Sequence, residues 1–335
     1  MRRRVEIKPS GHQFYVESDE TILDAALRQG VNLRYGCRNG ACGACKGKIL
    51  EGSVSYDEDP IALSDDDKAD NLSIFCAATP ASELVIEVEE IDLGSAIEIK
   101  TLPCRVQQMN RLADDVMQLL IKLPSSERLQ FLAGQYIDIL LEDGRHRSFS
   151  IANAPHNDEF LELHVRHIED GLFTPKVFNS MQEKDLLRIE GPHGSFFYQE
   201  DSQREIILMA GGTGFAPIKG IIEHLLEEKE TRPIHLYWGA RSEADLYLNK
   251  MAETWAAENE NIHYTPVLSE ADDSWSGKTG YVHKTVLSDF ADLNPYDIYV
   301  CGPPAMIVAA KEQFQTKGMD MGSFYFDSFD FAGDH

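Results

Sequence analysis

The sequence predicts a multidomain protein with three successive parts: an α+β part, an antiparallel β-barrel, and an α/β part built on a parallel sheet. A chain of 335 residues is too long for one average domain and fits two or three. The pattern of apolar residues also changes twice, first to dense strand alternation and then to strands alternating with helices. These changes place the parts at residues 1–93, 101–200 and 204–335, with a linker over 92–100.

The first part opens with two short strand patterns, VEIKP and QFYVE, in which apolar and polar residues alternate. The stretch DETILDAALRQG predicts a short amphipathic helix, with Asp19 as its N-cap and Gly30 at its end. The run ELVIEVEEI then predicts a closing strand. Strands combined with one short helix indicate a small α+β domain.

The middle part is rich in strand patterns. The stretches AGQYIDILL, RSFSIANAP and LELHVRHI alternate apolar with polar residues, and Gly, Pro and Asp separate them. A succession of short strands of this kind predicts a small antiparallel barrel.

From about residue 204 the pattern becomes strand, turn and helix. EIILMA leads through GGTG into APIKGIIEHLLEEKE, and DIYVC leads into GPPAMIVAAKEQF. Strands that alternate with helices predict a parallel sheet with a ligand site at the carboxyl ends of its strands.

The overall charge and hydropathy exclude some classes of partner. A formal net charge of −25 argues against nucleic acids and anionic membranes, because such a surface repels phosphates. No stretch approaches the roughly 18 to 20 apolar residues of a membrane span. The start, MRRRVEIKPSGH, lacks the apolar segment of a signal peptide. We therefore expect a cytoplasmic protein, and a monomer, since no feature for self-association is visible.

Four of the six cysteines have the spacing of an iron–sulfur ligand set. Cys37, Cys42 and Cys45 follow the pattern C-x4-C-x2-C, and Cys76 comes after thirty further residues. This is the plant-type [2Fe-2S] spacing, in which one loop supplies three thiolates and a second segment supplies the fourth. Zinc is the alternative, but a zinc ribbon needs two C-x2-C knuckles and only one is present.

Glycine is frequent around these cysteines, at positions Gly36, Gly40, Gly43 and Gly47. Because glycine permits tight turns, we expect backbone amides to point at the sulfurs and stabilise a negatively charged cluster. Residues 1–93 resemble the plant-type ferredoxins, which implies a β-grasp fold. The resemblance also implies that Cys37 and Cys42 bind one iron and that Cys45 and Cys76 bind the other.

Two short motifs in the middle part suggest a flavin site. Arg147, Phe149 and Ser150 end a strand pattern, and Gly171 and Thr174 follow a later one. They resemble the R-x-Y-S and G-x-x-S/T signatures of the ferredoxin–NADP reductase superfamily. The resemblance implies that Arg147 pairs with the FAD pyrophosphate, Gly171 and Thr174 hold it, and Ser150 bonds near flavin N5. Phe149 replaces the usual Tyr, which keeps stacking but removes the phenolic hydrogen bond.

The loop GGTGFAP at 211–217 lies between a strand and a helix, the context in which backbone amides face a pyrophosphate. It resembles the G-G-T-G-x-x-P loop of the same superfamily. The resemblance implies a hydride pocket shaped by Thr213, and a nicotinamide dinucleotide bound by Gly211, Gly212, Gly214 and Pro217.

Three further features complete this predicted site. Cys301 and Gly302 occupy the equivalent turn after a later strand, where the resemblance places the cysteine beside the nicotinamide; a buried core residue is the alternative. Phe329, near the C-terminus, is the candidate aromatic over the flavin, with packing on the core as the alternative. Acidic Glu243 and Asp245 favour NADH, although the neighbouring Arg241 would suit NADPH.

Together these motifs predict an enzyme that passes electrons from NAD(P)H to FAD, then to the [2Fe-2S] cluster and a protein acceptor. A hydride carries two electrons and a cluster accepts one, so a flavin between them connects the two. The domain order resembles that of oxygenase reductase components, whereas FLAGQYIDI and LLRIEGPHGSFF resemble the reductases of sugar 3-dehydrases. Either acceptor remains open, as does a non-catalytic, zinc-stabilised interaction protein.

Overall fold

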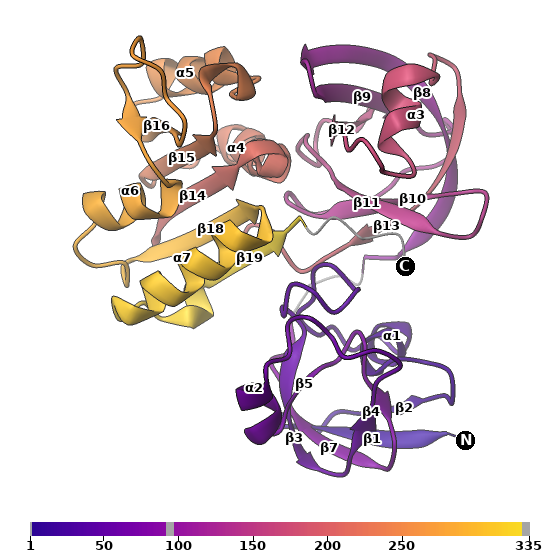
Figure 1. Cartoon of the computed structure of the whole chain (residues 1–335). Coiled ribbons are helices and arrows are strands. Elements are labelled where there is room, and N and C mark those ends of the chain that lie inside the picture. The colour runs from indigo at the N-terminus through magenta and orange to yellow at the C-terminus, as the bar shows by residue number, and fades with distance from the viewer. Residues whose placement is uncertain (1, 92–96, 330–335) are drawn as a thin grey trace. The chain divides into compact units, whose positions relative to one another are not determined.

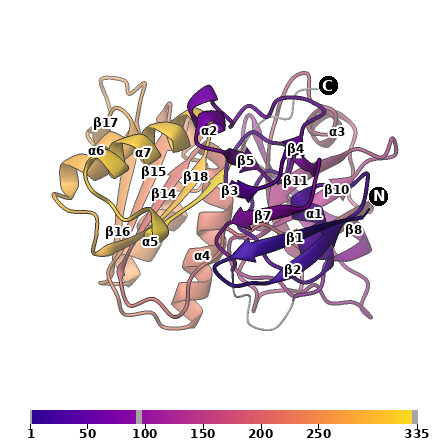
Figure 2. The same cartoon turned by 90° about the horizontal axis from the view of Figure 1, so that it is seen from below.

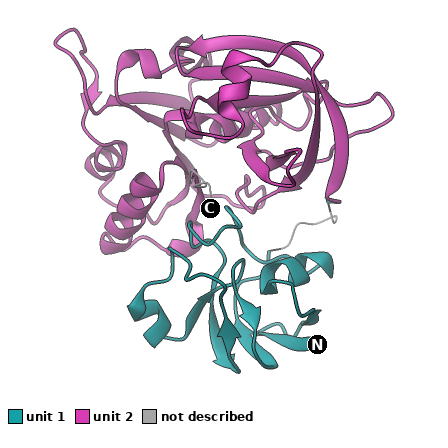
Figure 3. Ribbon diagram, turned by 45° about the vertical axis from the view of Figure 1, so that its right-hand side comes forward, with its two compact units in different colours: residues 1–97, 330–333 teal, residues 98–329, 334–335 magenta. Residues whose placement is uncertain are grey.

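The computed structural model describes residues 2–91 and 97–329, which divide into two compact units (Figure 3). The first unit holds the described residues up to 97, and the second holds residues 98–329. Each unit has its own buried core. Among the described residues, no helix is both long and apolar enough to span a lipid bilayer.

The first unit is built on a mixed five-stranded sheet in the order β2-β1-β7-β3-β5 (Figure 1). Strands β1 and β7 run parallel, and the other neighbours run antiparallel. Apolar side chains from the sheet and from helix α1 form the core. The elements are β1 (Arg3–Lys8), β2 (Gln13–Val16), α1 (Ile22–Arg28), β3 (Lys46–Glu51), β4 (Val54–Ser55), α2 (Asp65–Ala69), β5 (Leu72–Ile74), β6 (Thr79–Pro80) and β7 (Leu84–Glu87).

Helix α1 starts later than its sequence pattern predicts. Thr21 is the N-cap, because its hydroxyl accepts a hydrogen bond from the amide of Asp24 at 3.1 Å. The prediction of Asp19 was therefore wrong. A β-branched Thr competes well as a cap, and here it also donates to the Asp24 carboxylate at 2.8 Å. The helix ends at Arg28, and Gly30 follows with a φ of +77°.

The second unit begins with a six-stranded antiparallel sheet in the order β11-β10-β13-β8-β9-β12. A bridge between Ile151 and Leu163 joins its two edges, so the sheet closes into a barrel. Apolar side chains fill the interior. The elements are β8 (Lys100–Ala113), β9 (Val116–Lys122), β10 (Tyr136–Leu140), β11 (His146–Ser150), β12 (Leu161–Arg166), α3 (Thr174–Asn179) and β13 (Leu186–His193).

The same unit continues as a parallel six-stranded sheet in the order β17-β16-β15-β14-β18-β19. Two separate cores cover its faces: α4 and α5 pack on one face, and α6 and α7 pack on the other (Figure 2). The strands are β14 (Glu205–Gly211), β15 (Ile234–Ala240), β16 (Ile262–Leu268), β17 (Lys278–Thr279), β18 (Tyr296–Gly302) and β19 (Phe324–Ser328). The helices are α4 (Phe215–Glu227), α5 (Asn249–Glu258), α6 (Val282–Asp289) and α7 (Pro304–Thr316), with short 3₁₀ turns η1 (Gly212–Gly214), η2 (Glu243–Asp245) and η3 (Met321–Ser323).

The chain order across this parallel sheet creates a ligand crevice. The chain moves from β14 to β15 and β16 on one side, and later to β18 on the other side of β14. Loops after β14 and β18 therefore leave the sheet in opposite directions, which is where open α/β sheets bind ligands.

Candidate cofactor sites

The four cysteines of the predicted ligand set come together in the first unit. The amide of Cys37 donates to Cys42 Sγ at 3.4 Å, and the amide of Cys42 donates to Cys37 Sγ at 3.3 Å. The amide of Cys76 donates to Cys45 Sγ at 3.4 Å. These contacts group the cysteines in the same pairs that the ferredoxin resemblance implies.

The surroundings of these sulfurs suit a negatively charged group. Amide donors stabilise thiolates, and the amide of Ala44 adds a further hydrogen bond to Cys42 Sγ at 3.4 Å. Four soft sulfur donors with no oxygen or nitrogen ligand among them fit an iron–sulfur cluster.

The glycines near the cluster loop have two different roles. Gly40 has a φ of +81°, and a Cβ there would lie 2.9 Å from Pro60 Cβ, so this turn needs glycine. Gly43 is also left-handed, with a φ of +72°. Gly47 instead lies within β3, where a Cβ would come 2.4 Å from the ring of Phe75. Its small size serves packing, whereas the sequence predicted a turn.

The first flavin motif lies on β11 of the barrel. Arg147 and Phe149 are two residues apart and share one face of the strand. The ring of Phe149 lies 5.5 Å from that of Phe173, centroid to centroid, and Ser150 is buried opposite Tyr136 of β10. One guanidinium nitrogen of Arg147 donates to its neighbour's carbonyl, His146 O, at 2.8 Å. The strand therefore presents a cation, an aromatic ring and a hydroxyl in sequence.

The second flavin motif forms a closed turn before α3. The Thr174 hydroxyl accepts from the amide of Ile168 at 2.9 Å and donates to its carbonyl at 3.0 Å. A Cβ at Gly171 would lie 3.0 Å from that hydroxyl. The hydroxyl of Thr174 is thus engaged in closing the turn, and only the backbone of this motif is left to meet a phosphate.

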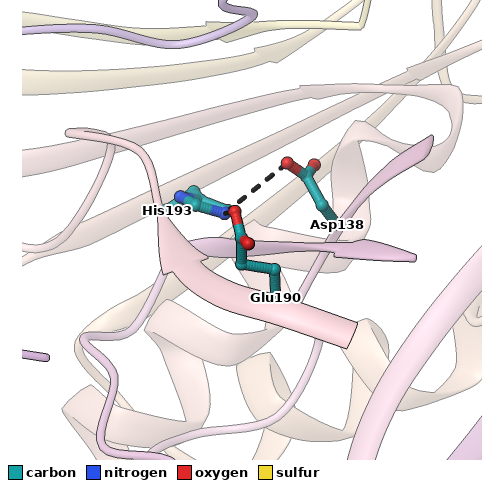
Figure 4. A group of neighbouring side chains, drawn as sticks. All are labelled: Asp138, Glu190 and His193. Carbon is teal, nitrogen blue, oxygen red and sulfur yellow. Dashed lines mark ion pairs between the residues drawn. The ribbon is translucent and has the colours of Figure 1, made fainter. Parts of the chain in front are cut away.

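A charged cluster lies on β10 and β13, beside the first flavin motif (Figure 4). His193 Nε2 is 3.5 Å from Asp138 Oδ2 and 3.4 Å from Glu190 Oε1. Asp138 also accepts a hydrogen bond from the hydroxyl of Ser148 at 2.6 Å. Asp138 and His193 are both buried, so their contact lies in a place with little solvent.

The glycine loop after β14 borders a cavity of about 580 Å³. Gly211 and Gly212 line it, as do Gly239 and Pro303 at the ends of the neighbouring strands. Gly212 has a φ of +54°. Its carbonyl oxygen accepts a hydrogen bond from the indole nitrogen of Trp238 at a distance of 3.0 Å. The cavity therefore opens where the parallel sheet was expected to bind a ligand.

Close backbone packing explains the other glycines of this region. A Cβ at Gly214 would lie 2.1 Å from Cys301 O, and one at Gly211 would lie 2.7 Å from Met306 Sδ. Gly302 has a φ of +150°, and a Cβ there would approach Gly211 O to 2.9 Å. Side chains at these positions would clash with neighbouring backbone or with Met306 and would force the loop to shift.

The remaining predicted residues lie around this loop. Cys301 is fully buried in the core shared by β14, β15 and α4, and burial raises the pKa of its thiol well above the usual value. Cys301 is not among the residues that line the cavity, and its place beside the nicotinamide stays a prediction. Thr213 and Pro217 lie in the loop and the first turn of α4. The amide of Phe329 donates to Gly302 O at 2.9 Å, which places this aromatic beside the same turn.

Of the three residues expected to select between NADH and NADPH, two line the cavity and one does not. Arg241 and Asp245 line the cavity, with Arg241 Nη2 3.8 Å from Asp245 Oδ1. The other oxygen of Asp245 accepts from the amide and hydroxyl of Ser242, both at 2.9 Å. Glu243 is exposed and lies outside the cavity lining.

Arg166 is a lining residue that motif reasoning missed. It ends β12 of the barrel, yet its Nη1 would lie 3.2 Å from a Cβ at Gly212. Its Nε is 3.3 Å from Asp115 Oδ2, and Nε and Nη2 are buried with no hydrogen-bond partner among the described residues. Arg166 is partly exposed, and a guanidinium group with donors that are not engaged in hydrogen bonds fits a phosphate group. The contact joins the barrel to the α/β part of the second unit, so no local sequence pattern predicts it.

Family models match three successive parts of the chain. A 2Fe-2S iron-sulfur cluster binding domain matches residues 5–81, an oxidoreductase FAD-binding domain matches 103–198, and an oxidoreductase NAD-binding domain matches 208–312. These matches confirm the predicted cofactors, [2Fe-2S], FAD and NAD.

Whole-length relatives have the same organisation. The chain is 40% identical over 329 residues to the CDP-6-deoxy-L-threo-D-glycero-4-hexulose-3-dehydrase reductase of Yersinia pestis, covering 98% of this chain and 99% of that protein. It is 38% identical to the reductase component of phenol 2-monooxygenase from Pseudomonas sp. (strain CF600), covering 92% and 89%. A crystal structure of an Amycolatopsis cytochrome P450 reductase superimposes with a TM-score of 0.82 at 30% identity, covering 99% and 100%.

Proposed function

The chain belongs to the family of reductases that join a [2Fe-2S] ferredoxin domain to FAD- and NAD-binding domains, and within it we propose that its electron acceptor is a sugar 3-dehydrase. The observation that supports this acceptor is the 40% identity to a 3-dehydrase reductase over 98% of this chain. The stretches FLAGQYIDI and LLRIEGPHGSFF, which resemble CDP-6-deoxy-3,4-glucoseen reductase, point the same way.

The protein is an oxidoreductase that takes electrons from NAD(P)H and passes them through FAD and the cluster to a protein acceptor. When bound, the flavin supplies the conversion of a two-electron hydride into single electrons. The chain's own residues bind and orient these groups, and the chemistry needs no acid–base triad. The alternative of a non-catalytic zinc-stabilised protein is wrong, because all three oxidoreductase domains are present.

We assign the binding roles by the groups that each region offers. Cys37, Cys42, Cys45 and Cys76 hold the cluster, because they have the ligand spacing and amides point at the sulfurs of the first three. On the barrel, Arg147 balances the pyrophosphate charge of FAD, and Phe149 packs against its ring system.

Around the site of hydride transfer, Ser150 and Thr213 offer hydroxyls from the two sides of the second unit. The glycine loop and Gly302 leave room for the dinucleotide, and Arg166 donates to its pyrophosphate. Phe329 covers the flavin edge beside Gly302. We favour NADH over NADPH, because Asp245 lines the cavity where a 2′-phosphate would be repelled.

A second candidate acceptor is the oxygenase component of an aromatic hydroxylase. It is favoured by the 38% identity to a phenol 2-monooxygenase reductase component. Acceptor choice depends on surface shape, which differs between proteins that share this electron path. The monomeric state and the cytoplasmic location also remain predictions, and light scattering on a sizing column tests the first.

The experiment that tests the proposal supplies both acceptors in parallel. The purified, FAD- and cluster-loaded protein is mixed anaerobically with NADH and either a sugar 3-dehydrase or a phenol hydroxylase component. We expect turnover of the deoxysugar substrate with the dehydrase at a rate at least about tenfold above that of the hydroxylase pair. Equal support of both, or support of the hydroxylase alone, would contradict the proposed acceptor.

A further inference from the structure

A buried network of charged groups joins the barrel to the α/β part of the second unit. At its centre is Lys219 of α4, which is only 3% exposed. Its ammonium group donates to Glu162 Oε2 at 2.9 Å, to Glu223 Oε1 at 2.7 Å and to Ala152 O at 3.1 Å. An ammonium group has three hydrogens, and all three are used.

The network continues into the barrel through Glu162 of β12. Glu162 Oε1 accepts from Gln118 Nε2 at 2.7 Å and lies 2.8 Å from His164 Nε2. His164 Nδ1 in turn lies 3.1 Å from the hydroxyl of Tyr247, which belongs to the α/β part. Two separate contacts therefore join the barrel to the α/β part of the second unit: Lys219 with Glu162, and Tyr247 with His164.

The protonation states of these groups fix the direction of each hydrogen bond. Burial lowers the pKa of His164 and raises that of Tyr247 well above its usual value, so both are neutral near pH 7. The Tyr247 hydroxyl then donates to His164 Nδ1, and Nε2–H donates to Glu162. Burial raises the pKa of Glu162, but the bond from His164 and the charge of Lys219 outweigh it and keep the pKa low.

The network joins β12, whose last residue lines the nucleotide cavity, to α4, which follows the glycine loop at the cavity edge. Helix α4 follows directly from the glycine loop, and Lys219 lies one turn into it. Strand β12 carries Glu162 and ends four residues later at Arg166, which lines the cavity. Gly220 allows this close approach, because a Cβ there would lie 3.1 Å from Asn153 O.

Buried ion pairs add little net stability, because removing two charges from water offsets their attraction. Their geometry is restrictive, however, since a small displacement leaves a buried charge without its partner. A buried ion-pair network with such restrictive geometry suits a reaction that needs two bound groups at a fixed separation.

We propose that Lys219, Glu162 and His164 are positioning residues for hydride transfer, because they lock α4 and β12 in the register that aligns nicotinamide with flavin. None of the three is among the residues that line the nucleotide cavity. This inference rests on the flavin and dinucleotide sites proposed above and adds to them the part that sets their separation.

The test compares Lys219→Met with a matched control, Lys250→Met, which alters an exposed lysine on α5. Flavin reduction by NADH is followed by anaerobic stopped-flow absorbance in the FAD-loaded, full-length protein. For Lys219→Met we expect the limiting rate to fall at least about tenfold while the apparent Kd for NADH changes less than about threefold. Hydrogen–deuterium exchange, measured without NADH, should be faster in α4 and β12.

A second variant protects the test against misfolding. Lys219→Met leaves two carboxylates without their cation, so the double variant Lys219→Met/Glu162→Gln is measured in the same way. If a folded, FAD-loaded variant keeps a limiting rate within about twofold of wild type and unchanged exchange, the proposal is overturned. Loss of folding in both variants would assign the network to stability alone and would overturn it as well. Absence of flavin reduction in the wild type would instead count against the proposed function.

Discussion

The carbonyl oxygen of Cys301 lies directly against the α-carbon of Gly214, so that an added Cβ would come within 2.1 Å of it. Gly214 ends the glycine loop, and Cys301 lies near the end of β18. The contact therefore joins the loops of two neighbouring parallel strands at the crevice. Neither backbone can move away freely, because β18 pairs with both β14 and β19.

Gly214→Ala should weaken NADH binding about tenfold. Overpacking of this kind costs about 1 to 3 kcal/mol, and a shift of the loop changes the cradle that meets the pyrophosphate. The measurement is the apparent Kd for NADH in flavin reduction. Gly322→Ala is the control, since its nearest contact would be 3.3 Å from an Asp320 oxygen on an exposed turn. An unchanged Kd in Gly214→Ala would show that the loop tolerates the methyl group.

Arg166→Gln should raise the apparent Kd for NADH about tenfold and leave FAD content unchanged. The guanidinium has buried donors facing Gly212, and a charge-assisted bond to phosphate contributes about 1.5 to 3 kcal/mol. The dependence of the rate of flavin reduction on NADH concentration, followed by stopped-flow absorbance, gives the apparent Kd. Arg111→Gln, on the exposed part of β8, is the control. Equal affinities in both variants would remove Arg166 from the dinucleotide site.

Local spacing predicted the parts of the fold and site that depend on local chemistry. The cysteine spacing and the glycine loop are specific local patterns, so the cofactors could be predicted from the sequence. The N-cap of α1 did not, because Asp19 and Thr21 are both good caps and tertiary packing decides between them.

Residues whose roles depend on tertiary contacts could not be predicted either, because local patterns do not show which distant segments they meet. Arg166 and Glu162 lie in an ordinary strand pattern, and nothing in LELHVRHI indicates that they contact the glycine loop and α4. Lys219 lies on a helix whose pattern makes any lysine look solvated. For Cys301, a sequence motif suggested contact with the nicotinamide. The structure places this residue in the core of the α/β part.

Arg147→Ala should reduce FAD retention. Loss of the cation leaves the pyrophosphate charge uncompensated, and a charge-assisted pair contributes about 1.5 to 3 kcal/mol, so we expect at least about tenfold weaker binding. The flavin-to-protein ratio after dialysis measures this. Arg145→Ala is the control on the same hairpin, where Arg145 pairs with Asp143 at 2.7 Å. Unchanged flavin occupancy in Arg147→Ala would exclude this residue from the site.

Asp67→Asn should destabilise the cluster loop by about 1 kcal/mol. The Asp67 carboxylate accepts from Lys46 at 2.7 Å and from the Ser64 amide at 2.9 Å, which ties α2 to the residue after Cys45. The bond from Lys46 lowers the pKa of Asp67 to about 2. The stabilisation is therefore complete above its unfolded pKa of about 3.9 and is lost as the pH falls toward 2.

The measurement for Asp67→Asn is the urea midpoint of cluster bleaching, taken at about pH 5, 6 and 8. We expect the same difference from wild type at each pH, since the carboxylate is fully ionised throughout. Asp66→Asn, an exposed neighbour on α2, is the control. A difference that shrinks between pH 8 and 5 would mean that another group titrates in this interaction.

Cys42→Ser should abolish electron transfer to the protein acceptor while NADH still bleaches the flavin. Cys42 receives amide bonds from Cys37 and Ala44, so its sulfur lies at the centre of the cluster loop, and a hydroxyl is a poor ligand for iron. The flavin and nucleotide residues belong to the second unit and are unaffected by the change. Flavin absorbance measures the first step, and the electron paramagnetic resonance signal of the reduced cluster measures the second. Cys104→Ala, in the barrel core, should keep both signals. Loss of NADH-driven bleaching in a folded, FAD-loaded Cys42→Ser protein would contradict a path in which the flavin is reduced before the cluster.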